Sequence, residues 1–167
     1  MKLRHIKKAP FEIAQQLALD NKVVNLIFND NKTALTDSNV AVSISELIEK
    51  NYIGFYPATE SGINLIDRNT FIIINMEDIN LHAEDNNIRA TGAIYVTTDK
   101  DHCLLENNSL RLLELVDAIE SCLEGEKISA AGKIQLSSVN YVVFSDFRSG
   151  YRINFRINDQ QSRKAEL

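Results

Sequence analysis

The sequence predicts an α+β fold with a single antiparallel or mixed β-sheet, helices packed mainly on one face, and the order α-α-β-β-α-β-β. Apolar residues recur at helical spacing near the N-terminus and again over 109–124. Runs rich in β-branched residues at 71–81 and 88–98, and at 133–145 and 151–157, are joined by polar turns, as in antiparallel hairpins. A chain of 167 residues with 44% hydrophobic and 25% charged residues matches one globular domain.

The first part of the chain predicts helices. Apolar residues from Pro10 to about Asn29 are mostly three or four positions apart, and Asp20-Asn21 could divide this stretch, so one long helix and two short ones remain open. Ser43, followed three residues later by Glu46, has the spacing of a capping box and predicts a two-turn helix. The polar residues 29–39 predict a loop between them.

Residues 51–69 combine glycine, proline and aromatic residues, which indicates a partly buried irregular segment. The run that follows, Phe71 to Ile74, is apolar at every position and predicts a strand buried on both faces. Residues 88–98 alternate between apolar and polar side chains, as expected of its antiparallel partner.

The clearest helix is predicted at 109–124, where an apolar stripe precedes Gly125, a residue suited to a left-handed C-terminal cap. Residues 151–157 alternate as a half-buried strand does. Because the helix must cover the apolar face of that strand, we expect four residues to share one core: Leu115, Ile119, Ile153 and Phe155.

Three segments are expected along the chain: a basic N-terminal arm at 1–9, a single domain at 10–158 and a flexible tail at 159–167. The first twenty residues contain Phe11, Glu12 and Gln15 where a signal peptide would be apolar, which predicts synthesis in the cytoplasm. No membrane partner is expected. The two cysteines, Cys103 and Cys122, are interpreted as small packing residues.

Charge and motifs argue against several classes of function. A net charge of −5 does not attract polyanions, so nucleic-acid binding would need a local patch. The three histidines are isolated, neither cysteine belongs to a C-x-x-C motif, and no nucleotide-binding or nucleophile-elbow motif is present. We therefore expect a protein that is not an enzyme and that uses no metal or cofactor.

The second half carries a resemblance. A helix reading L-x-x-L-V-x-A-I-x-x-x-L from Leu112 is followed by K-I-S-A-A-G-K-I-Q-L-S-S-V and by a hairpin ending G-Y-R-I-N-F-R-I. This arrangement resembles the tail-terminator and head-to-tail completion proteins of tailed bacteriophages, in which a "G-K-L-x-L" strand and a closing "G-Y-x-L-x-F-x-V" strand follow a late helix. The N-terminal helix, the Pro57 loop and the two strands after it agree loosely, so the match spans about residues 10–158.

The resemblance implies a structural virion protein, made in the host cytoplasm, that forms a ring at the junction of tail tube and neck. Its partners would be copies of itself in a ring such as a hexamer, the tail tube, and neck or portal-side proteins. DNA would pass through the ring without specific binding, which suits an acidic chain. The alternative is a cytoplasmic bacterial adaptor or small-ligand-binding α+β domain, with the segment from Tyr52 to Gly62 over a pocket.

Residues for the intersubunit contacts are expected in loops and on one strand face. The loop 29–41, the segment 52–66 and the tail have no apolar period, and ordered loops of this length usually have a partner. On the last strand two arginines share one face, which we interpret as a solvated or partner-facing surface rather than as a nucleic-acid surface. The candidate interface residues are Asp30, Lys32, Asp37, Tyr52, Phe55, Tyr56, Arg152, Arg156 and Arg163.

Overall fold

A six-stranded mixed sheet with the order β1-β2-β3-β6-β5-β4 forms the centre of the protein. The computed structural model describes residues 6–55, 62–63, 66–81, 88–128 and 132–158. β1 is parallel to β2, and every other neighbouring pair is antiparallel. The strands are β1 (Ile53–Gly54), β2 (Thr70–Leu81), β3 (Ile88–Asp99), β4 (Lys127–Ile128), β5 (Gly132–Val143) and β6 (Arg148–Asn158).

Four α-helices and one short 3-10 helix are present in the described part of the chain: α2 (Ala9–Leu19), α3 (Asn21–Phe28), α4 (Ile44–Glu49), η1 (Lys100–His102) and α6 (Arg111–Leu123). Asp20 separates α2 from α3, because its backbone is extended and its side chain accepts a hydrogen bond from the N–H of Val23. Ser43 caps α4 in the same way. Gly125 follows α6 with φ of 77°, a conformation that favours glycine.

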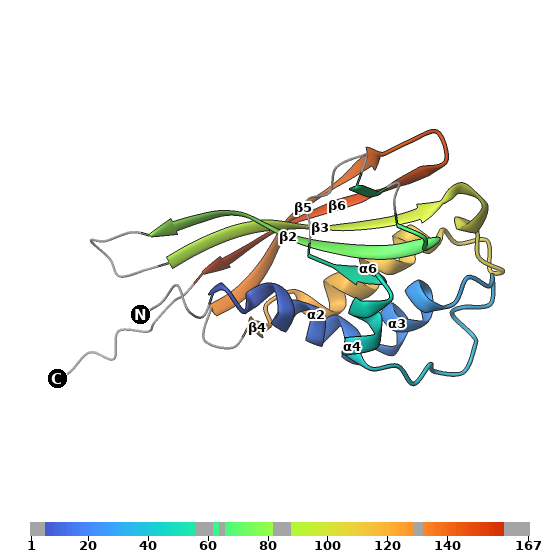
Figure 1. Ribbon diagram of the computed structural model, residues 1–167, viewed down its shortest axis with the longest axis horizontal. Helices are drawn as coiled ribbons and strands as arrows, with labels where there is room; N and C mark the ends of the chain where they lie inside the picture. The colour runs from blue at the N-terminus through green and yellow to red at the C-terminus, as the bar shows by residue number, and fades with distance from the viewer. Residues whose placement is uncertain (1–5, 56–61, 64–65, 82–87, 129–131, 159–167) are drawn as a thin grey trace.

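The core lies between the helices and one face of the sheet. α2 and α3 contact β2, and α6 contacts β3, β5 and β6. In Figure 1 the four helices lie below the sheet. Leu115, Ile119, Ile153 and Phe155 belong to one buried cluster, as predicted. Phe155 lies so close to β3 that a Cβ at Gly92 would come within 2.5 Å of its ring, so the strand needs glycine there.

The element order differs from the predicted α-α-β-β-α-β-β. The first predicted helix is two helices, and the two-residue strands β1 and β4 are additional. Strands this short have no periodicity that a sequence could reveal. The last strand begins at Arg148 rather than Tyr151, because the turn that precedes it closes with Phe144 and Ser145 donating to the carbonyl of Arg148.

The predicted N-terminal arm is packed at the positions that the structure describes as buried. Ile6 and Ala9, the described ends of the predicted N-terminal arm, are buried in the main core. The predicted tail 159–167 lies outside the described residues.

A second, smaller cluster covers one end of the opposite sheet face. Ile63 and Ile66 pack there on Phe71, Ile73 and Phe144. Arg148 holds this segment in place, because its guanidinium donates to the carbonyl oxygens of residues 63, 66 and 68 at 2.8, 3.3 and 3.0 Å. The same guanidinium pairs with Asp99 at 2.7 Å and lies over the ring of Phe71.

Candidate assembly interface

The outer edge of β5 is open over residues 137–143. β4 pairs with β5 only at residues 132 and 133. The chain just before β4 then continues along the edge, because Ile134 exchanges hydrogen bonds with Gly125 and Glu126, and the N–H of Leu136 donates to the Glu124 carboxylate at 2.7 Å. Beyond Leu136 no described strand lies beside β5 on its outer side.

A β-bulge between Leu136 and Ser138 decides which side chains this edge presents. The bulge adds one residue, so apolar residues occupy positions 134 and 136 before it and 139, 141 and 143 after it. Val139 pairs with Ile153 and Tyr141 with Tyr151. Residues directly opposite in a pair share a face, so these side chains lie on the face that carries the main core.

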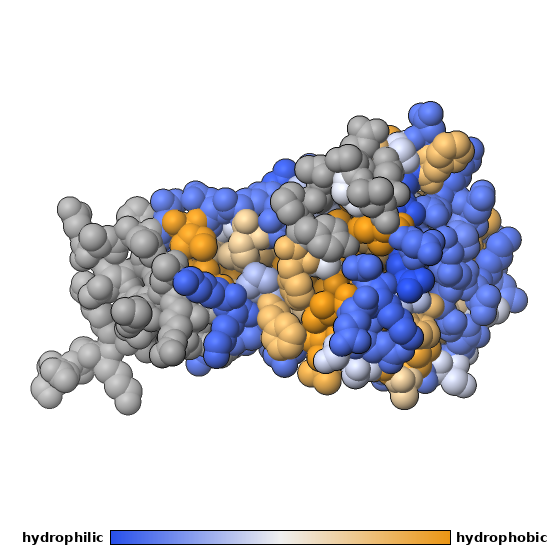
Figure 2. Space-filling view, in the orientation of Figure 1, coloured by the Kyte–Doolittle hydropathy of each residue, from blue (hydrophilic) through white to orange (hydrophobic). Residues whose placement is uncertain are grey.

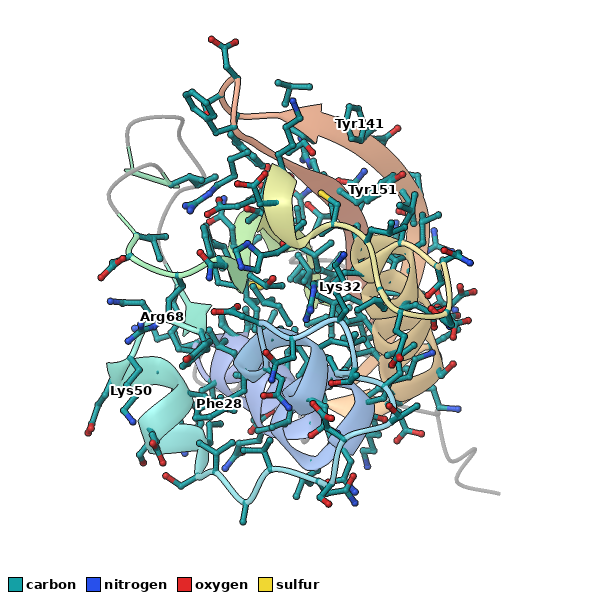
Figure 3. All side chains as sticks on the ribbon, turned by 90° about the vertical axis from the view of Figure 1, so that its right-hand side faces the viewer. Phe28, Lys32, Lys50, Arg68, Tyr141 and Tyr151 are labelled. Carbon is teal, nitrogen blue, oxygen red and sulfur yellow. The ribbon has the colours of Figure 1, made fainter. Side chains whose placement is uncertain are left out.

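The helices do not cover this part of the face. Val139, Tyr141 and Val143 are 47%, 61% and 63% exposed, and Phe147 in the turn after β5 is 76% exposed. Figure 2 shows apolar surface at the end of the β5–β6 hairpin, which Figure 1 places at the upper right. Figure 3 shows Tyr141 on the curled hairpin with Tyr151 nearer the helices, and the two rings meet edge to face at 5.6 Å.

The backbone of this edge also presents hydrogen-bonding groups to an added strand. The N–H groups of Ile134 and Leu136 point outward, away from β6. Because the bulge adds one residue, the residues whose N–H groups point outward after it are the odd-numbered ones. The N–H of Phe144 donates inward to Arg148, which agrees with an outward orientation for Val143. An added strand could therefore bond to Val139, Tyr141 and Val143. Residues 137–143 contain no charged residue and no proline, so this stretch lacks those edge-blocking residues.

The opposite edge of the sheet is different. β1 covers β2 only at Ile72 and Ile73. Beyond them β2 has a bulge between Met76 and Asp78, and Asp78 is exposed, whereas the carboxylate of Glu77 pairs with Arg152. A bulge combined with charge is a common way of preventing strand addition. The open edge suited to pairing is thus the one at β5.

Three predicted interface residues belong to a loop that is anchored to its own chain. Asp30 accepts a hydrogen bond from Asn69 at 2.6 Å, and Asp37 accepts one from Asn29 at 2.9 Å. Lys32 is exposed, but its carbonyl accepts from the N–H of Glu106. The loop also passes beside the fully buried Arg111, which donates to the carbonyl oxygens of Asn29 and Asn31 at 2.7 and 2.6 Å.

The predicted aromatic residues only partly come together. Tyr52 stacks on Phe28 at 5.0 Å between ring centroids and lies under the guanidinium of Arg68 at 4.9 Å. Figure 3 shows Phe28 and Arg68 on the side that also carries Lys50. Phe55 is exposed, whereas Tyr56 lies outside the described residues, as does Arg163.

Arg152 and Arg156 share the sheet face opposite the main core, as the alternation predicts. Arg152 pairs with Glu77 at 2.6 Å and lies over the ring of Tyr95. Arg156 donates to Gln135 at 2.9 Å. Both guanidinium groups are therefore engaged within the chain, but only that of Arg152 is paired with an opposite charge.

The sequence reasoning missed Val139, Tyr141 and Val143, although a signal for the bulge was present. Apolar residues at 134, 136, 139, 141 and 143 step by two, then three, then two, and the step of three marks the extra residue. That the edge is open follows from the strand order, which no local pattern reveals.

Other parts of the described surface give weaker indications of a functional site. In the described ranges no group of three or more histidine, cysteine, aspartate or glutamate residues is placed to hold a metal ion. None of the described helices is long and apolar enough to span a bilayer. A hollow of about 210 Å³ is lined by Lys32, Thr33, Leu35, Thr36, Glu106 and Asn107.

Comparison with known proteins gives one family. Residues 20–157 match the family model described as YomW, whereas no curated protein matches the chain. The matched range includes the open edge of β5 and both long hairpins. The name YomW comes from the phage-derived SPbeta region of Bacillus. The chain therefore belongs to the YomW family and is phage-related.

Proposed function

We propose that this protein is a structural component of a tailed phage, forming a ring at the tail end or neck that terminates the tail tube and joins it to the head. The observation that carries this proposal is the open, uncharged edge of β5 with its three exposed apolar side chains. Such an edge offers hydrogen bonds and apolar contacts to another chain at once. Its work is assembly, not catalysis.

Membership in a phage-related family supports the virion assignment. A contact between unlike surfaces of identical subunits closes into a ring when the rotation between neighbours allows it. The β5 edge would then meet a different surface of the next subunit. The partners in this proposal are copies of the chain, the tail tube and neck or portal-side proteins. A net charge of −5 suits a ring through which DNA slides without specific binding.

The small-ligand alternative has weaker support. Ligand pockets usually have volumes of about 300 to 1,000 Å³ and enclose most of the ligand. The hollow beside Lys32 measures about 210 Å³. A larger hollow of about 570 Å³ is lined by one aromatic residue and six charged or polar ones: Phe147, Asp99, Lys100, Asp101, Ser145, Asp146 and Arg148. Ligand pockets are lined mainly by apolar side chains, and neither hollow is lined by a described residue of the segment 52–62. We therefore propose the assembly role as the only function.

A phage that encodes this chain provides the test. Deleting the gene should yield DNA-filled heads separated from tails, with tails of irregular length in electron micrographs. Supplying the wild-type protein should restore joined particles. The variant Tyr141→Asp should not, because a carboxylate on the β5 edge would be desolvated by any added strand.

Leu19→Asp is the matched control, since Leu19 is 77% exposed at the end of α2, away from the β5 edge. It should restore joining as the wild type does. Both variants should melt within a few degrees of the parent, since the changed side chains are exposed. Normal joined particles from Tyr141→Asp would show that the edge is not used. Normal particles from the deletion itself would contradict the function.

A further inference from the structure

We propose that in the free protein two copies pair through their β5 edges, antiparallel, about a two-fold axis at Tyr141. The sheets of the two copies would join into one continuous sheet, and the exposed apolar edge would be covered by its own equivalent. The partner is therefore a second copy of this chain.

The register of the edge supports this partner. A two-fold axis at Tyr141 places Tyr141 opposite Tyr141 of the second copy, and Val139 opposite its Val143. These are the residues whose N–H and C=O groups point outward, so each opposed pair can exchange backbone hydrogen bonds. All of their side chains lie on one face, so apolar side chains meet only apolar or aromatic ones across the junction.

The opposite face of the junction is compatible too. There Asn140 would lie opposite Val142 of the second copy, and Ser138 would lie near its Phe144. Because residues 137–144 contain no charge, the antiparallel pairing brings no like charges together. Pairing with the far edge of a second copy would instead bring the strand against the exposed carboxylate of Asp78, against the Glu77–Arg152 ion pair and against a bulge. The absence of charge and the regular backbone at this edge thus favour pairing of β5 with β5 of the second copy.

This pairing has a consequence for assembly, which rests on the proposed function. The dimer and the ring contact would use the same edge, so the dimer would keep the edge covered until a tail offers a better partner. A dimer held together covalently should then be unable to join tails.

Disulfide trapping tests the register. Tyr141→Cys should form a covalent dimer under mild oxidation, because the two-fold axis brings the Cα atoms of residue 141 in the two copies to about 5.5 Å from each other. Val143→Cys is the control. Its copies would lie four residue steps apart along the strand, about 13 Å, which is too far for a disulfide. Val139→Cys combined with Val143→Cys should form dimers again.

The two natural cysteines should not interfere. Both are free thiols, and burial raises the pKa of the Cys122 thiol to about 11. Burial also raises the pKa of Cys103. Because the thiolate is the reactive form, the parent chain should stay uncross-linked under the same conditions.

Sedimentation of the unmodified protein is the second measurement, since it does not depend on a variant. The parent should shift from monomer to dimer as its concentration rises, and Tyr141→Asp should remain monomeric. A parent that stays monomeric throughout would overturn the dimer. Cross-linking of Val143→Cys as efficient as that of Tyr141→Cys, or a ladder of larger species, would overturn the two-fold register. A trapped dimer that joins tails as well as the reduced protein does would leave the dimer standing and contradict the role of this edge in the proposed function.

Discussion

Replacing Arg111 by methionine should lower the free energy of unfolding by about 3 kcal/mol, because a buried acceptor that loses its donor costs about 1 to 3 kcal/mol. Arg111 is fully buried. Its guanidinium donates to the carbonyl oxygens of Leu26, Asn29, Asn31 and His102 at 2.7, 2.7, 2.6 and 2.9 Å. Methionine fills a similar volume but leaves these acceptors without their donors, and unsatisfied buried polar groups are costly.

Arg156→Met is the control for this change. Arg156 is exposed and donates to one side chain, that of Gln135. We expect a loss within about 0.5 kcal/mol for it, as for most surface substitutions. Urea unfolding followed by circular dichroism measures both. Equal stability of the two variants would mean that Arg111 does not hold the loop 29–31 to the helices.

Shortening Ile119 to alanine should also be severe, with a loss of about 2 to 5 kcal/mol, because the removed atoms leave a cavity in a close-packed core. Ile119 lies on the buried stripe of α6 and belongs to the same cluster as Ile153 and Phe155 on β6. Leu113→Ala on the same helix is the control, since Leu113 is exposed. Thermal melting of the two variants separates them. A melting curve for Ile119→Ala that matches the parent would contradict the packing of α6 on β6.

Much of the fold could be predicted because its signals are local. The stripe of α6, the alternation of β6 and the cap at Ser43 all follow from short-range spacing. Arg111 shows the limit of that reasoning. An arginine at the start of an amphipathic helix is ordinarily exposed to solvent. Only the tertiary structure brings four carbonyl oxygens to its guanidinium group.

The candidate interface shows a second limit. Val139, Tyr141 and Val143 have the composition of a core strand, and the sequence gives no reason to separate them from Ile134. What separates them is the sheet order, which places β6 next to β3 and leaves β5 outside. The loop 29–41 lacks apolar periodicity, yet Ala34 within it is buried and Arg111 donates to the carbonyl oxygen of Asn31.

We propose that this protein is a part of the virion at the junction of head and tail. Labelling it with an antibody coupled to gold and imaging purified phage particles tests that claim most directly. We expect label at the junction of tail and head on intact particles, and at the same end of tails that have not yet been joined. Abundant protein in the lysate with no label on purified particles would contradict the account.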